Sequence, residues 1–140
     1  IRRAEAARAA ALSAARADLT APNHFDFDRS DILATDQPIL DRKAALMAAN
    51  PSAQIRIEGN TDERGSDEYN LALGMRRAAA AKQHLRDGGV DPSRIATSSN
   101  GEERPTCQAP DETCWSQNRR ADFVITAGDG ALVTASRGRK

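Results

Sequence analysis

The sequence predicts an α+β domain, a two-layer sandwich in which helices cover one face of a mixed four-stranded sheet. Short strand patterns, several of which alternate polar and apolar residues, occur at 24–28, 55–59, 94–98 and 121–126. Two stretches with helical spacing lie between them, at 36–47 and 67–86. The expected order is therefore strand, helix, strand, helix, strand, loop, strand.

Composition limits the classes of function that the chain can have. The 140 residues suit one domain with tails, and 20 basic residues balance 20 acidic ones, so we expect no nucleic-acid partner. No apolar run reaches the ~18–20 residues of a membrane span. Any membrane attachment would therefore use a lipid anchor outside these residues.

Residues 1–23 are expected to be an Ala/Arg-rich leader or linker. Helix propensity is high, but Ile1 and Leu12 are the only large apolar residues in 1–17. We therefore expect a frayed helix rather than a docked part of the core. The domain should span 24–127, beginning with the strand at His24.

The first helix should begin near Asp36, because Pro38 is tolerated in a first turn, and end at Asn50-Pro51. After the second strand, the long helix can be capped by Ser66 or Asp67 and closed by Gly88-Gly89. A helical wheel assigns its core face to Leu71, Met75, Ala78 and Leu85. An adjoining edge gathers Asn70, Leu73, Gly74 and Arg77.

Gly74 costs about 1 kcal/mol relative to alanine inside a helix, but it leaves room for a close approach. That approach could be made by a ligand or by a neighbouring loop, and the sequence does not separate the two.

The third and fourth strands flank a loop of about 20 residues, 100–118, and the stretch 128–140 reads as a loose tail. The loop contains both cysteines, Cys107 and Cys114, and we expect a disulfide and an oxidising compartment, with two free thiols as the alternative. A zinc site would need two further ligands, and His24 and His84 are distant in sequence, so no metal is expected.

The stretch 61–65 links a strand end to a helix start, a common position for ligand-holding groups. If the two residues lie together, Asp62 would offer an acceptor for an ammonium, and Arg77 would offer a planar fork for a carboxylate. A zwitterionic amino-acid centre needs these two groups. Asp62 could instead cap the turn or form a structural salt bridge with Arg77.

Residues 60–78, NTDERGSDEYNLALGMRRA, resemble the signature of the OmpA-like family of peptidoglycan-binding domains, most closely in the form found in peptidoglycan-associated lipoproteins (Pal). The resemblance extends to HFDFDRSDI at 24–32, GEERP at 101–105 and SQNRRADFVI at 116–125. It covers about residues 24–126. The two cysteines depart from the usual Pal pattern.

The resemblance implies non-covalent binding of the meso-diaminopimelate in the peptidoglycan stem peptide. Asp62 would hold its amine and Arg77 its carboxylate. Pocket-lining roles fall on Phe27, Asp28 and Leu73, with Ser30 nearby. Supporting roles fall on Thr61, Asn70, Asn118 and Arg119.

The resemblance further implies a periplasmic, non-catalytic protein without cofactors, which tethers the outer membrane to the cell wall through an N-terminal lipid. As a component of the Tol-Pal system it would meet TolB and other Tol proteins, although no residue identifies them. The alternatives are an OmpA-type or stator-type wall anchor outside the Tol system, or a cell-wall hydrolase. Two isolated histidines and paired cysteines do not supply hydrolytic chemistry.

Overall fold

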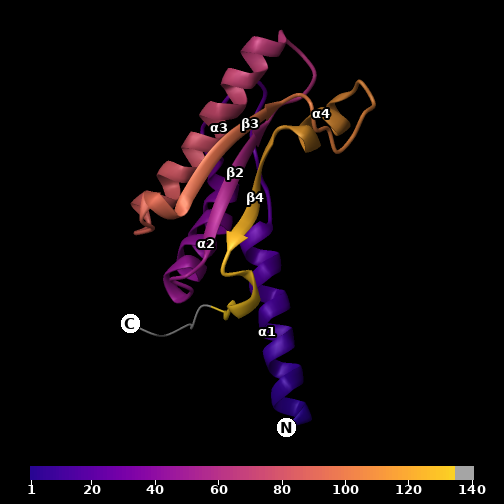
Figure 1. The fold of residues 1–140 in the computed structure, drawn as a ribbon. Coiled ribbons are helices and arrows are strands. Elements are labelled where there is room, and N and C mark those ends of the chain that lie inside the picture. The colour runs from indigo at the N-terminus through magenta and orange to yellow at the C-terminus, as the bar shows by residue number, and fades with distance from the viewer. Residues whose placement is uncertain (135–140) are drawn as a thin grey trace.

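A four-stranded mixed sheet forms the centre of the computed structural model, which describes residues 1–134 (Figure 1). The strands are β1 (Asn23–His24), β2 (Gln54–Asn60), β3 (Ile95–Gly101) and β4 (Arg120–Ala127). Their order is β1-β4-β2-β3, with β2 parallel to β3 and β4 antiparallel to both of its neighbours. The predicted fold class, an α+β domain with a mixed four-stranded sheet, is confirmed.

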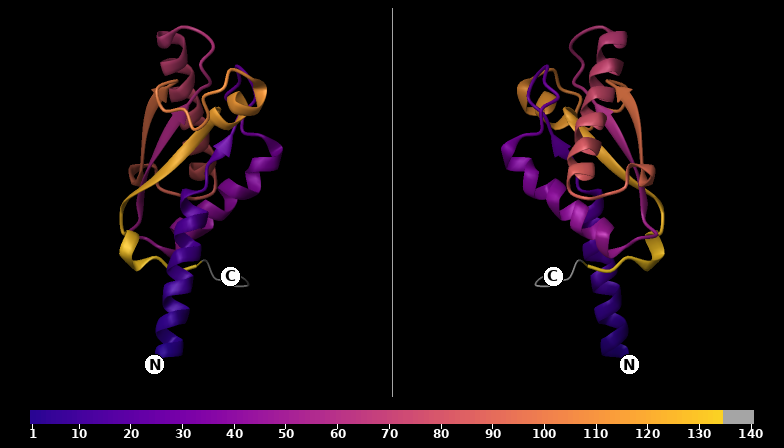
Figure 2. Two further views of the ribbon diagram at one scale, coloured as in Figure 1. Left: turned by 90° about the vertical axis from the view of Figure 1, so that its right-hand side faces the viewer. Right: turned by 90° about the vertical axis from the view of Figure 1, so that its left-hand side faces the viewer.

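The main helices are α1 (Arg2–Thr20), α2 (Gln37–Ala49), α3 (Asp67–Asp87) and α4 (Glu112–Asn118). Figure 2 shows α2 and α3 on the same side of the sheet. Ser66 caps α3 by accepting a hydrogen bond from the Tyr69 amide, and the helix ends at Gly88, as predicted. The core between the layers is built mainly from Ala, Leu, Ile and Val, with two phenylalanines, Phe25 and Phe123.

Two glycines bring α3 against the sheet. A Cβ atom on Gly59 of β2 would overlap the carbonyl oxygen of Gly74, and one on Gly74 would lie 2.9 Å from the Gly59 carbonyl oxygen. The close approach at Gly74 is therefore a packing contact with strands β2 and β3, not with a ligand or a loop. It sets the N-terminal half of α3 directly on the end of β2.

This contact also explains why the predicted core face of α3 is partly wrong. Ala78 and Leu85 are buried, but Leu71 and Met75 are 43% and 42% exposed. The buried face includes the edge that carries Asn70, Leu73, Gly74 and Arg77, together with Ala78, Ala81 and Leu85. The glycine contact turns this edge toward the sheet. A helical wheel that gives most weight to large apolar residues instead assigns the core face to Leu71 and Met75.

The expectation that 1–23 stays undocked is wrong for its second half. Ala15 and Leu19 are buried in the core and Leu12 packs partly against it, at the spacing of one helical face. The buried Lys43 ammonium donates to the carbonyls of Asp18, Leu19 and Ala21, and so satisfies the end of α1. The first half of α1 extends beyond the body of the domain (Figure 1).

Three other expectations need correction. The first strand is limited to 23–24, because the chain turns after Phe25 and Asp28 adopts a left-handed φ of 59°. The 100–118 loop contains α4. The tail is docked as far as Val133, because Leu132 enters the core and the Val133 amide donates to Asn50. The rest of that tail, 135–140, lies outside the described residues.

Candidate functional site

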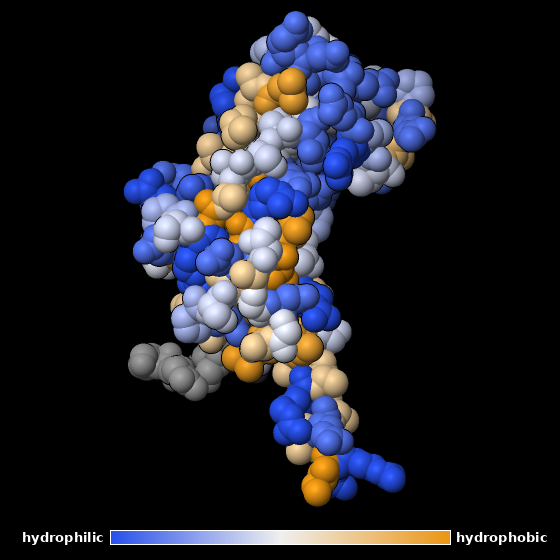
Figure 3. Space-filling model, in the orientation of Figure 1, coloured by the Kyte–Doolittle hydropathy of each residue, from blue (hydrophilic) through white to orange (hydrophobic). Residues whose placement is uncertain are grey.

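A cavity of about 240 Å³ lies at the N-terminal end of α3, between the 25–30 loop that follows β1 and the 61–66 loop that follows β2. Seven predicted site residues line it, namely Phe27, Asp28, Thr61, Asp62, Asn70, Leu73 and Arg77. Arg64, Gly65 and Tyr69 complete the lining and were not predicted. Ser30 is not among the lining residues. The end of the molecule that holds this pocket has a largely hydrophilic surface (Figure 3).

Asp62 is buried and is bound by a fork from Arg64. Its Oδ2 accepts from Arg64 Nη2 at 2.7 Å, and its Oδ1 accepts from Arg64 Nε at 3.2 Å and from the Arg64 amide at 3.0 Å. Arg119 Nη1 lies 3.6 Å from Oδ2. Burial alone would raise the pKa of Asp62, but the Arg64 hydrogen bonds and the charges of Arg64 and Arg119 lower it below its ordinary value. The carboxylate is therefore ionised at neutral pH.

Arg77 is fully buried, and backbone carbonyls hold its guanidinium. Nε donates to Arg29 O at 2.8 Å, Nη1 to Asn60 O at 2.9 Å and Nη2 to Asp26 O at 3.0 Å. Burial lowers the pKa of Arg77 to about 10, so it stays charged at neutral pH. Arg77 thus fastens the 26–29 loop to the end of β2.

The structure does not bring Asp62 and Arg77 together as an ion pair. Within residues 1–134, the carboxylate of Asp62 is paired with Arg64 and Arg119, while Arg77 faces carbonyls. Three of the five N–H donors of Arg77 are used in this way. The structural salt bridge left open by the sequence is therefore absent, although both residues line one cavity.

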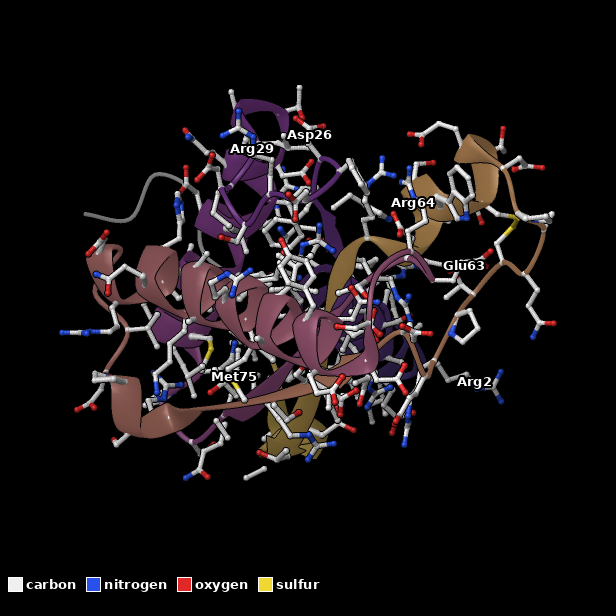
Figure 4. The ribbon with its side chains drawn as sticks, turned by 90° about the horizontal axis from the view of Figure 1, so that it is seen from above. Arg2, Asp26, Arg29, Glu63, Arg64 and Met75 are labelled. Atoms are coloured by element: carbon white, nitrogen blue, oxygen red, sulfur yellow. A yellow bond between two sulfur atoms is a disulfide. The ribbon has the colours of Figure 1, made fainter. Side chains whose placement is uncertain are left out.

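Arg64 is stacked between two aromatic rings. Its Cζ lies 3.9 Å from the centroid of Phe27 and 4.0 Å from that of Trp115 on α4. Figure 4 shows Arg64 beside α4, on the opposite side of the site from Asp26 and Arg29. The stack joins three segments that are distant in sequence, so no local pattern could reveal it.

Asp28 and Tyr69 form a second polar pair on the lining. The Tyr69 hydroxyl donates to the Asp28 carboxylate, and this bond raises the pKa of Tyr69. Asp28 is thus a second anionic group in the pocket. Together with Asp62 and the guanidinium groups of Arg64 and Arg77, it gives the cavity charges of both signs.

The supporting residues hold the loops around the pocket. The Thr61 amide donates to Gly101 O, and Asn70 Nδ2 donates to Glu102 at 2.6 Å. Arg119 donates to Phe25 O at 2.8 Å and pairs with Glu112. The Asn118 side chain binds the backbone of residues 106–107. Cys107 and Cys114 form a disulfide.

Comparison with known proteins identifies relatives for most of this domain. A sequence model described as the OmpA family matches residues 24–120. The peptidoglycan-associated lipoprotein of Haemophilus influenzae is 50% identical over 98 residues, which cover 70% of this chain and 64% of the relative. That of Rhizobium meliloti is 50% identical over 101 residues, covering 72% and 57%. The chain thus spans less than two thirds of the length of either relative.

Two solved structures have a similar fold. The peptidoglycan-associated lipoprotein of Burkholderia pseudomallei superposes with a TM-score of 0.73 at 42% identity, covering 74% of this chain and 88% of that one. The C-terminal domain of Helicobacter pylori MotB has a TM-score of 0.70 at 21% identity, covering 75% and 83%, and shares the fold alone. No helix within residues 1–134 has the length and apolar character required to cross a membrane.

Proposed function

The chain belongs to the OmpA family, and on this basis we propose that it binds peptidoglycan non-covalently through the meso-diaminopimelate of the stem peptide. The observation that carries the proposal is one cavity that brings the ionised Asp62 together with guanidinium groups of Arg64 and Arg77. The side-chain end of diaminopimelate is zwitterionic, with an ammonium and a carboxylate on one carbon. It therefore needs an anionic and a cationic group within a few ångströms of each other.

The size of the cavity supports a small ligand group. About 240 Å³ lies just below the roughly 300–1,000 Å³ of pockets that enclose a drug-sized molecule. The end of one diamino acid would fill it, while the glycan and the rest of the stem peptide would remain outside. Leu73 and Phe27 provide apolar walls for the methylene groups between the two amino-acid centres.

The electrostatics of the pocket support binding rather than catalysis. Glycoside hydrolysis needs a general acid whose pKa is raised, together with a second carboxylate. The Asp62 pKa is instead lowered, and none of the ten lining residues is a histidine, cysteine or serine that could serve as a base or nucleophile. We propose a non-catalytic role, which incubation with purified sacculi would test. Release of soluble muropeptides would contradict it.

The proposed cellular role is that of a periplasmic wall anchor. The relatives at about 50% identity are named peptidoglycan-associated lipoproteins. This similarity supports a tether between the outer membrane and the cell wall, with a lipid outside this chain and TolB as a partner. We favour a Pal-type anchor over the other wall anchors because the named relatives at about 50% identity are of the Pal type.

Isothermal titration calorimetry with a diaminopimelate-containing muropeptide tests the site. Asp62→Asn keeps the shape of the side chain but removes the charge that would pair with the ammonium. We expect at least about tenfold weaker binding, equivalent to the ~1.4 kcal/mol of one charge-assisted hydrogen bond. Glu63→Gln is the matched control, because Glu63 is exposed in the same loop and does not line the cavity. Equal affinity in the two variants would show that the Asp62 charge does not take part in binding, and would contradict the proposed site.

A further inference from the structure

A disulfide links the first half of α4 to the chain that precedes the helix. The disulfide joins Cys107 to Cys114, seven residues apart, and is visible at the outer edge of the site in Figure 4. Asn118, at the end of α4, accepts hydrogen bonds from the amides of Thr106 and Cys107 and donates to Cys107 O at 2.7 Å. Both ends of α4 are therefore fixed to the same stretch of backbone.

Two side chains of α4 reach Arg64. The Trp115 ring stacks on the guanidinium at 4.0 Å, and Glu112 Oε1 lies 4.0 Å from Arg64 Nη2. Glu112 also pairs with Arg119 at 2.8 Å. The same helix thus holds both guanidinium groups that approach Asp62.

Arg64 transmits this restraint to the ligand-binding carboxylate. Its fork bonds both oxygens of Asp62, and its other face stacks on Phe27. With α4 in place, Arg64 is stacked on two rings and bonded to both oxygens of Asp62. Without it, Arg64 loses one of its two stacking partners, and Arg119 loses the carboxylate that it shares with Arg64.

We propose that segment 107–118 is a positioning element of the pocket, so that the state of the Cys107–Cys114 disulfide sets the affinity for ligand. Trp115 is a positioning residue that acts through Arg64 on Asp62. The inference rests on the proposed function, because it takes the diaminopimelate centre as the ligand. A carboxylate held in advance binds without the cost of ordering it, whereas a mobile one loses affinity.

Trp115 is the only tryptophan in the chain, so its fluorescence reports on this segment without a label. In the ligand-free protein, reduction and alkylation of the two cysteines should shift the emission toward that of a solvated indole. Arg64→Met should also change the emission, because it removes the stacked guanidinium. Unchanged emission after reduction would show that the segment keeps its position without the disulfide, and would overturn the proposal.

The affinity for a diaminopimelate-containing muropeptide tests whether the position of this segment affects ligand binding. We expect Cys107→Ser/Cys114→Ser and Trp115→Ala to bind about 3- to 10-fold more weakly, the range of one partly buried cation–π contact. Trp115→Phe keeps a stacking ring and should restore binding to within about twofold. Arg86→Ala, at an exposed position near the C-terminal end of α3 and outside this segment, should leave affinity unchanged. Circular dichroism establishes that each variant is folded before titration.

The outcomes separate the two proposals. Binding by the oxidised protein that is unchanged by reduction and by Trp115→Ala would overturn the positioning role and leave the proposed function standing. Weaker binding in Trp115→Ala that Trp115→Phe does not restore would also overturn it, because stacking would not be the cause. Absence of binding in every sample, including the oxidised protein, would refute the proposed function and this inference with it.

Discussion

Replacing Arg77 by alanine should destabilise the whole domain and not only the pocket. The guanidinium is fully buried and satisfies the carbonyls of Asp26, Arg29 and Asn60. A buried polar group left without its partner costs about 1–3 kcal/mol. For three carbonyls, some of which water can reach through the cavity that alanine leaves, we expect a loss of about 3–6 kcal/mol. This is a large part of the ~5–15 kcal/mol by which domains are stable.

Urea denaturation at pH 7, followed by circular dichroism, measures this loss. Arg76→Ala is the matched control, because Arg76 is the neighbouring arginine on the same helix but is exposed. Its free energy of unfolding should change by no more than about 0.5 kcal/mol. If Arg77→Ala lost less than about 1 kcal/mol, the three carbonyl contacts would not be structural and Arg77 would be free to act as a ligand group alone.

Three further predictions concern the packing of the domain. Gly59→Ala should lower the free energy of unfolding by about 1–3 kcal/mol, since its Cβ overlaps the Gly74 carbonyl. Gly130→Ala is the control, because a Cβ atom there meets nothing within 4 Å. Equal thermal midpoints in the two variants would refute the close contact. Leu19→Ala should cost about 2–5 kcal/mol in urea unfolding, and a loss near zero would show that α1 is not docked. Burial lowers the pKa of Lys43 to about 7, while the unfolded chain keeps its proton up to about pH 10.4. The unfolded state therefore binds more protons in this window, and the stability of the native sequence relative to Lys43→Met should rise from about pH 7 to 10. A difference that does not vary with pH would contradict this.

The elements that the sequence predicts well are those specified locally. The bounds of α3 follow from Ser66 at one end and Gly88 at the other, strand β2 follows from its alternating residues, and strand β4 contains a short apolar run at 123–125. These signals lie within a few residues of the element that they define. The wheel also placed Leu73 and Arg77 beside each other on one edge of α3, which is the edge that lines the pocket.

The errors lie where a distant partner decides the outcome. Leu19 and Leu132 are buried in the core cluster with residues from α2 and the sheet. The sequence around each of them is not apolar enough to predict this burial. Leu71 and Met75 are exposed because the Gly59–Gly74 contact, which joins two separate elements, sets the rotation of α3.

In the site, too, the residues that line the pocket follow from local sequence, whereas their direct partners are set by the tertiary fold. Asp62 and Arg77 were paired on chemical grounds, and they line one cavity, yet their direct partners are Arg64 for one and backbone carbonyls for the other. Arg64 belongs to the quoted motif, but its role depends on Phe27 and Trp115, from two other segments. A sequence can place a charged residue in a loop, but the stacking partners come from the tertiary fold.

We propose that the pocket recognises the zwitterionic end of diaminopimelate. Calorimetry with two muropeptides that differ only in their third residue, meso-diaminopimelate or lysine, tests this recognition. Lysine retains the amine but lacks the carboxylate, so one guanidinium group of the pocket would remain without its partner. We expect at least about tenfold tighter binding of the diaminopimelate form. Equal affinity for the two peptides would contradict the mechanism.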